Sequence, residues 1–197
     1  MIIQTTLLTC HKGVDLHADT AERVIRNNLP GGERLLVLHR AELHTFWHED
    51  GAEAPDSVER MLTVGRFFNP NKHRYLHCEL KSENTPWFEA ESQRGFVLPE
   101  NWPGSVLDTD LEAGNGTLDK LFGTPQGIAV DVCAFPLGES GPVISGVLWR
   151  LLIDADNEAD AVRIATGLIE TRDAGSGLLV NPHMEGWLTS HPALREV

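Results

Sequence analysis

Runs of apolar and β-branched residues along the chain predict three strands in its first half, over residues 1–9, 34–50 and 73–81. A helix is expected between the first two runs, with Asp19 or Thr20 as its cap and Pro30 at its end. The apolar residues of this helix recur at helical spacing and are Ala21, Val24, Ile25 and Leu29. A second helix is expected over residues 55–68, before the third strand.

The second half repeats much of this order. Residues 127–137 and 144–156 are strand candidates joined by the hairpin-like segment GESGP, and a last strand is expected at 184–190. Residues 157–173 have the clearest helical pattern, because Asn157 can cap them and acidic residues crowd the first turn. The apolar stripe of this helix is formed by Ala161, Ile164, Ala165 and Leu168. Weaker candidates are a helix at 105–123 and a short strand in RGFVLPE.

Each half thus approximates the order strand, helix, strand, strand, helix, strand, which is the ferredoxin-like pattern. The run GVLWRLLI is apolar on both sides, so both faces of its sheet must be covered. We therefore predict an α+β fold made of two ferredoxin-like halves whose antiparallel sheets pack against each other. The first repeat is expected at residues 1–82, a linker at 83–94 and the second repeat at 95–197.

One motif occurs in each half with the same internal spacing, as GRFFNPNKHRYL at 65–76 and GLLVNPHMEGWL at 177–188. Proline disfavours helical geometry in the residue before it and has no N–H to donate, so Asn-Pro is expected to end a helix. The pair predicts one helix-to-strand corner built twice. The surfaces of the two corners have diverged, since the first carries Lys72, His73 and Arg74 after its proline and the second carries His183, Met184 and Glu185.

Composition narrows the classes of partner. The net charge of −13, from 29 acidic and 16 basic side chains, would repel nucleic acid and anionic membranes, so neither is expected to bind. Three cysteines form neither an even disulfide set nor a CxxC pattern, and we expect reduced thiols. No signal peptide and no run of about 18 apolar residues is found, which favours a cytoplasmic location.

The ending of the second half resembles a known family. Residues 152–187, LIDADNEADAVRIATGLIETRDAGSGLLVNPHMEGW, run from strand through helix to Asn-Pro and an aromatic residue. This ending is similar to that of the PurS-type small subunit of phosphoribosylformylglycinamidine synthase, and SVLDTDLEAGNGTLDKLFG resembles that family's Val-Leu-Asp segment. The family's Asp-Pro-Gln-Gly is replaced here by Asp108-Thr109-Asp110-Leu111, and its small subunit is normally a single repeat rather than a tandem one.

The resemblance implies a protein that catalyses nothing alone, needs no cofactor and forms a homo-oligomer. It would serve purine biosynthesis as an accessory subunit of an ATP-dependent amidotransferase, bridging the synthetase and the glutaminase. The corners and their neighbours would then be protein contacts, namely Asn69, Pro70, Lys72, Arg74, Asn181, Pro182, His183 and Trp187. The alternative is that Asn69 and Asn181 only form local hydrogen bonds that end a helix.

A different hypothesis uses the histidines of the first half. His44 and His48 could share a metal ion on a helix, but on a strand four residues separate them by roughly 13 Å. His73 and His77 have the same spacing, so a metal site would need histidines from different strands, with Cys10 or Cys78 as further ligands. Histidines on half-exposed strands without a ligand are the simpler explanation.

Acid–base chemistry is the enzymatic alternative. His44, Glu42 and Glu49 could work in a sheet-lined cavity, as in dimeric α/β-barrel enzymes, because histidine is the usual general base near neutral pH. No nucleophile elbow, phosphate loop or HExxH motif accompanies them. A self-associating module with another partner is a third possibility.

Overall fold

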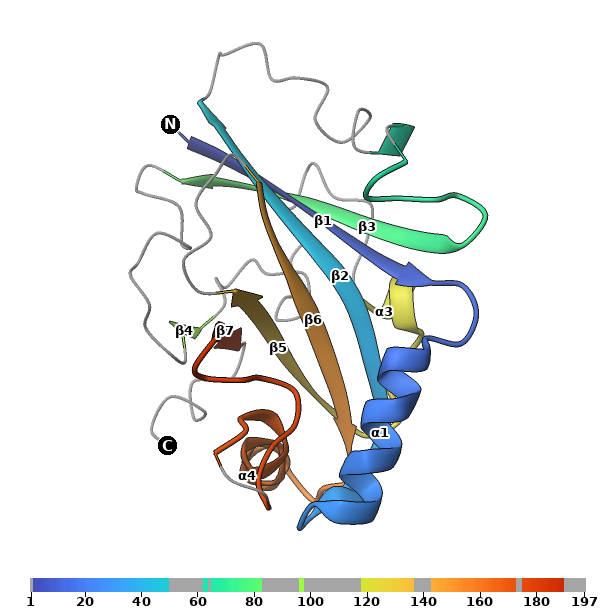
Figure 1. The fold of residues 1–197 in the computed structure, drawn as a ribbon, viewed down its shortest axis with the longest axis vertical. Coiled ribbons are helices and arrows are strands. Elements are labelled where there is room, and N and C mark those ends of the chain that lie inside the picture. The colour runs from blue at the N-terminus through green and yellow to red at the C-terminus, as the bar shows by residue number, and fades with distance from the viewer. Residues whose placement is uncertain are drawn as a thin grey trace.

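Seven strands form one twisted sheet in the computed structural model of the chain, which describes residues 2–49, 62–63, 65–82, 96–97, 118–136, 143–172 and 175–189 (Figure 1). The strands are β1 (Ile2–His11), β2 (Leu35–Glu49), β3 (His73–Ser82), β4 (Phe96–Val97), β5 (Ile128–Pro136), β6 (Val143–Ile153) and β7 (Glu185–Thr189). The predicted strands in both halves are confirmed.

The helices are α1 (Leu16–Asn28), α3 (Leu118–Phe122) and α4 (Glu158–Ile169), with a 3-10 turn η1 at Gly32–Arg34. Of the helix predicted over 55–68, residues 62–63 are helical and residues 65–68 are not, while residues 55–61 and 64 lie outside the described part of the chain. Residues 105–117 of the helix candidate that ends in α3 also lie outside the described part of the chain. Within the described ranges, no helix is both long and apolar enough to cross a membrane.

The order of strands in the sheet is β3-β1-β2-β6-β5-β7-β4. All neighbours are antiparallel except β4 and β7, which are parallel. β1 lies between β2 and β3, and β5 lies between β6 and β7. The pairing of β2 with β6 therefore joins two groups of three strands that have the same internal arrangement, and the fold is α+β with a mainly antiparallel sheet.

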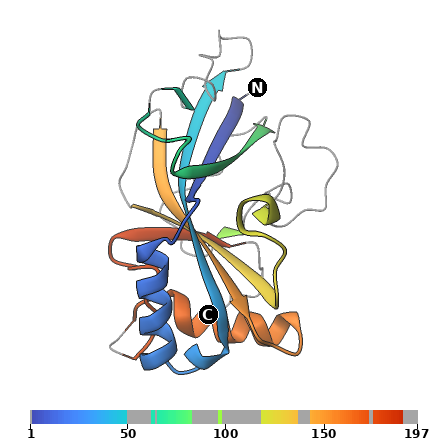
Figure 2. The same cartoon turned by 90° about the vertical axis from the view of Figure 1, so that its right-hand side faces the viewer.

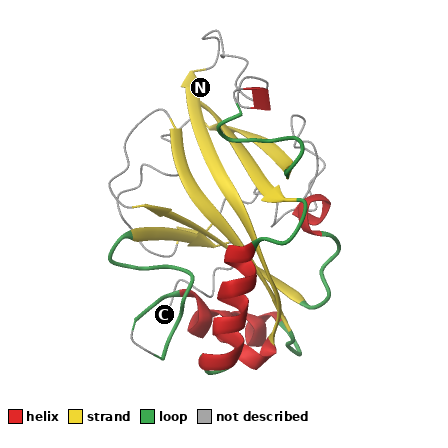
Figure 3. Ribbon diagram, turned by 45° about the vertical axis from the view of Figure 1, so that its right-hand side comes forward, coloured by secondary structure: helices red, strands yellow, loops and turns green. Residues whose placement is uncertain are grey.

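The prediction that two sheets pack face to face is wrong. The two groups of strands instead meet edge to edge within one sheet. The physical reason is that elements from the same chain cover both faces. Figures 2 and 3 show α1 and α4 together at one end of the molecule, against one side of the strands. The short helix α3 packs on the other side.

Two buried clusters correspond to the two faces. Beneath α1 and α4, residues such as Ile25, Leu151 and Leu168 form the larger cluster with β2, β5, β6 and β7. On the opposite face, Leu118 and Leu121 of α3 join a second cluster that reaches from β1 to β6. The strand β6 supplies residues to both, as expected for a run that is apolar on both sides.

The start of α1 differs from the prediction. Asp15, not Asp19 or Thr20, caps the helix, and its side chain accepts hydrogen bonds from the backbone N–H groups of His17 and Ala18. The prediction was wrong because Asp15, Asp19 and Thr20 can each serve as a cap, and apolar spacing does not choose between them. In α4, by contrast, the Asn157 cap and the buried apolar stripe are confirmed.

The two Asn-Pro corners have the same hydrogen bonds. In the first, Asn69 Oδ1 accepts from Asn71 N–H at 2.9 Å, and its carbonyl accepts from the N–H groups of Lys72 and His73. In the second, Asn181 Oδ1 accepts from His183 N–H at 3.1 Å, and its carbonyl accepts from those of Met184 and Glu185.

The backbone N–H of each asparagine then donates to the side chain four residues later, His73 in one corner and Glu185 in the other. Each corner leads directly into a strand, β3 or β7, so the motif is one turn built twice. The prediction that Asn-Pro ends a helix is wrong, because α4 ends at Ile169 and residues 65–68 are not helical.

A glycine with positive φ lies four residues before each asparagine, Gly65 at 70° and Gly177 at 56°. Their surroundings differ. A Cβ on Gly65 would meet nothing within 4 Å, whereas a Cβ on Gly177 would lie 1.9 Å from the carbonyl oxygen of Glu170. The second corner is thus packed tightly against the end of α4.

We expect Gly65→Ala to cost roughly 1–2 kcal/mol of unfolding free energy, the usual penalty for a left-handed residue with a side chain. Gly177→Ala should cost a further 1–3 kcal/mol or so, because the chain must move away from Glu170. Urea unfolding of both variants measures the difference. Equal losses would show that the corner at Gly177 is not held against α4.

Candidate functional site

The histidines proposed as metal ligands lie on strands. His44 and His48 are both on β2, and His73 and His77 are both on β3. Four residues of extended chain span about 13 Å, so neither pair can share one ion. The side chains of His48, Glu49 and Cys78 lie outside what the structure describes.

Across the strands, His44 and His77 both pair with Leu7 of β1, one from each side. Two strand spacings, about 10 Å, separate their backbones. His73 lies instead beside His11, with ring centroids 4.9 Å apart. Within the described residues, no group of three or more His, Cys, Asp or Glu side chains is placed to hold a metal ion.

His44 is the most enclosed of the histidines whose side chains the structure describes. Its side chain is buried, with 9% of the residue exposed, and its ring lies 4.6 Å from that of Phe67. Its Nδ1 is hydrogen-bonded to Ser145 Oγ at 2.9 Å, and its Nε2 is buried without a hydrogen-bond partner in the described structure. Burial lowers the pKa of His44, Arg66 lowers it further and Glu42 opposes the shift. The imidazole is therefore neutral at pH 7, with one nitrogen able to bind a ligand.

The proposed contact residues are divided between surface and core. Asn181 and His183 are exposed, as are Pro70 and Lys72, while Asn69 is half-buried. Met184 adds an exposed apolar side chain to the second corner, with 67% of the residue accessible. Trp187 and Pro182 are buried, and Trp187 belongs to the larger core cluster. Each corner therefore exposes a few side chains to solvent, whereas Trp187 at the end of the second motif packs in the core.

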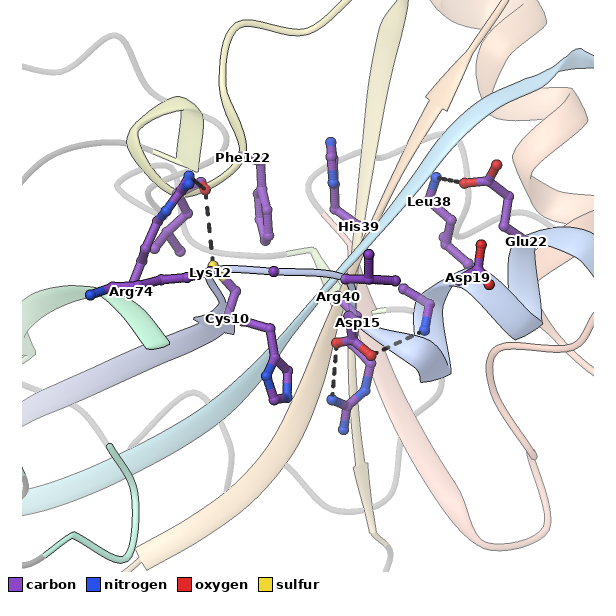
Figure 4. A pocket seen from close by; sticks show the side chains of 15 residues that line it. Cys10, Lys12, Asp15, Asp19, Glu22, Leu38, His39, Arg40, Arg74 and Phe122 are labelled. Carbon is purple, nitrogen blue, oxygen red and sulfur yellow. Dashed lines mark hydrogen bonds and ion pairs between the residues drawn. The ribbon is translucent and has the colours of Figure 1, made fainter. Parts of the chain in front are cut away.

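A cavity of about 310 Å³ lies beside the end of β1, and we name it the β1–β2 pocket (Figure 4). The pairing of β1 with β2 ends at Thr9 and Glu42, while β2 continues to Leu35. Cys10 and His11 pair with β3 alone. The two strands therefore diverge, and the pocket fills the gap between them.

Two elements close the gap. The loop after β1 and the first turns of α1 form one wall, and Leu121 and Phe122 of α3 form another. An ion pair between Arg150 and Asp119, 3.2 Å long, holds α3 on the sheet. The ring of His39 stacks on Phe122, with centroids 4.8 Å apart and planes 11° from parallel.

Beyond the end of β1, side chains of α1 form hydrogen bonds with the backbone groups at the edge of β2. Glu22 Oε2 accepts from Leu38 N–H at 2.8 Å, and Arg26 donates to the Leu36 carbonyl. Glu22 and Arg26 also pair with each other at 3.1 Å. An ion pair thus replaces part of a missing neighbouring strand, which keeps this edge from pairing with another chain.

Arg40 and Asp15 line the pocket as a largely buried pair, with side chains 15% and 13% exposed. Arg40 Nη1 lies 3.5 Å from Asp15 Oδ2, and Nη2 lies 3.6 Å from Glu42 Oε1. Charge-assisted hydrogen bonds are usually about 2.7–2.9 Å long, so both contacts are loose. Asp15 Oδ2 is buried and accepts no hydrogen bond within the described residues.

Of the pocket residues, only Arg74 was proposed as a contact from the sequence. The available signal was the length of the strand candidates, 1–9 against 34–50, since a long strand beside a short one must leave part of its edge unpaired. Sequence alone does not tell which residues line such a gap.

No protein-family model matches the chain, and comparisons with curated proteins and with solved structures found no match either.

We expect the unfolding free energy to fall as the pH drops below about 6.5, the ordinary pKa of histidine. His44 has a lowered pKa in the folded protein, so the unfolded chain binds protons first and acid favours unfolding. Burial also lowers the pKa of His39 and His73. His44→Gln should therefore make the loss between pH 7 and 5 shallower without abolishing it.

Chemical denaturation across this pH range measures that slope. His17→Gln, which removes an exposed histidine from α1, is the control and should keep the wild-type slope. An unchanged slope in His44→Gln would show that His44 does not titrate with unfolding.

Proposed function

We propose that the protein is a PurS-like, non-catalytic component of the formylglycinamide ribonucleotide amidotransferase complex. It would bridge the synthetase and glutaminase subunits. The observation that carries the proposal is the repeated corner: Asn69 and Asn181 form the same hydrogen bonds at the start of β3 and β7. This is the feature on which the resemblance to the small subunit rests.

The strand order supports two ferredoxin-like halves as part of this proposal. In that fold the first strand lies between the third and the fourth, and the second strand flanks the third. β1, β2 and β3 fit the first, third and fourth positions, and β5, β6 and β7 fit them again. Under this assignment β6 fills the second-strand position of the first half, and β2 fills that of the second half. Each half would complete the sheet of the other.

The surfaces of the corners support bridging of two different partners. The two corners have the same backbone hydrogen bonds, but the first exposes Lys72 and the second exposes His183 and Met184. A cationic surface and a partly apolar one are suited to different protein surfaces, because charge and desolvation both contribute to specificity. One partner at each corner is the simplest arrangement.

Affinity purification of the tagged protein from its source cell should recover a large synthetase and a glutaminase. Lys72→Glu should reduce recovery of one of them at least about tenfold, and Met184→Asp should reduce recovery of the other. The control is Arg163→Glu, which changes an exposed residue of α4 away from both corners. Failure of the wild-type protein to recover either subunit would contradict the proposal.

A ligand or metal binder that uses His44 is a second candidate. It is favoured by one observation, the buried Nε2 of His44 without a hydrogen-bond partner in the described structure. Metal analysis of the purified protein should then give a stoichiometric ion that His44→Ala removes and that His17→Ala retains. Absence of metal from both the wild-type protein and a zinc-supplemented sample would contradict the metal-binding form.

A further inference from the structure

Four of the charged side chains of the β1–β2 pocket lie apart according to sign, while Arg40 and Asp15 form a pair. Lys12 and Arg74 lie to one side of His39 in Figure 4, and Asp19 and Glu22 lie to the other. Arg40 and Asp15 complete a lining with three cationic and three acidic side chains. Opposite charges at two ends of one small cavity match a ligand that carries both charges.

We propose that the β1–β2 pocket binds a small zwitterion of the ω-amino acid class, whose two charged groups lie at opposite ends of the molecule, with its carboxylate toward Lys12 and Arg74 and its ammonium group toward Asp15 and Asp19. This inference does not depend on the role in an amidotransferase complex.

The cationic end has donors to spare. Lys12 Nζ donates to the Pro70 carbonyl at 2.6 Å, and Arg74 Nη1 donates to the Leu121 carbonyl at 3.4 Å. Neither residue forms an ion pair within the described part of the chain. A neutral carbonyl positions a cation without cancelling its charge, and ammonium and guanidinium groups have further N–H donors. A carboxylate is the ligand group that these donors bind best.

The acidic end has acceptors that are open or weakly held. Asp15 Oδ2 is buried without a hydrogen bond in the described structure, and its ion pair with Arg40 is loose. The partner of Asp19 is Arg23, whose side chain is 74% exposed, and such surface pairs contribute little stability. An ammonium group can therefore satisfy Asp15 and displace Arg23 from Asp19 at small cost.

Size and shape limit the ligand further. A cavity of about 310 Å³ lies at the lower end of the range of roughly 300–1,000 Å³ that is usual for small-molecule sites. The stacked rings of His39 and Phe122 give it one flat wall that suits the apolar part of a ligand between its two charged groups. A purely anionic ligand would face Asp15, Asp19 and Glu22, and a purely cationic one would face the three basic residues.

Isothermal titration calorimetry tests the proposal. ω-Amino acids of increasing chain length are first screened by thermal shift, and the strongest binder is then compared with its decarboxylated amine and its des-amino acid. We expect both analogues to bind at least about tenfold more weakly than the amino acid. Equal binding by the des-amino acid, or no binding by any ω-amino acid up to about 10 mM, would overturn the proposal.

Variants test which end of the pocket binds the carboxylate and which binds the ammonium group. Arg74→Gln should weaken both the amino acid and the des-amino acid, whereas Asp19→Asn should weaken the amino acid about tenfold and leave the des-amino acid unchanged. Arg163→Gln and Glu158→Gln on α4 are matched controls outside the pocket. Circular dichroism verifies folding, and Arg74→Lys should restore part of the affinity. Unchanged binding in both pocket variants would place the ligand elsewhere.

Discussion

The pairing of β2 with β6 is the interaction on which the rest of the fold depends. It runs from Leu35 opposite Ile153 to Phe46 opposite Val143, and Arg34 and Asp154 extend it by a further backbone hydrogen bond. Without it, each group of three strands would end in a long apolar edge with unpaired backbone groups, which costs free energy and favours aggregation. The pairing also brings α1 and α4 over one continuous surface, so the larger core cluster draws residues from both halves of the chain.

The same pairing explains why a pocket exists. β2 must be long enough to match β6, but β1 is shorter and pairs with β2 only as far as Thr9. The surplus part of β2 is supported on one edge by β6 and on the other by Glu22 and Arg26 of α1. Because side chains rather than a strand cover that edge, space remains beside Arg40, and the charged residues of the β1–α1 connection line it.

Local features of the chain could be predicted well from sequence, and long-range ones could not. The strand runs and the buried stripe of α4 follow from periodicity, whereas proline chemistry marked the Asn-Pro corners as turns but wrongly placed them at helix ends. Sequence did not predict that the two groups of strands join in one sheet. The same apolar pattern is compatible with two sheets packed face to face and with strands paired edge to edge. The pocket residues come from β1, α1, β2, β3 and α3, so no short motif could have marked them.

The two Asn-Pro corners have the same hydrogen bonds but different side chains around them. All the shared hydrogen bonds use backbone groups or the asparagine side chain, apart from the acceptor four residues later, which is an imidazole in one half and a carboxylate in the other. Any side chain with a suitable acceptor preserves the corner, so the strand start can vary without loss of structure. The surrounding residues diverged in the same way: Gly177 is packed against Glu170 while Gly65 is open, and Pro182 is buried while Pro70 is exposed. Conserved backbone geometry with different burial is the outcome expected when two copies of one corner are held in different surroundings, because the asparagine maintains the turn whichever surface lies beside it.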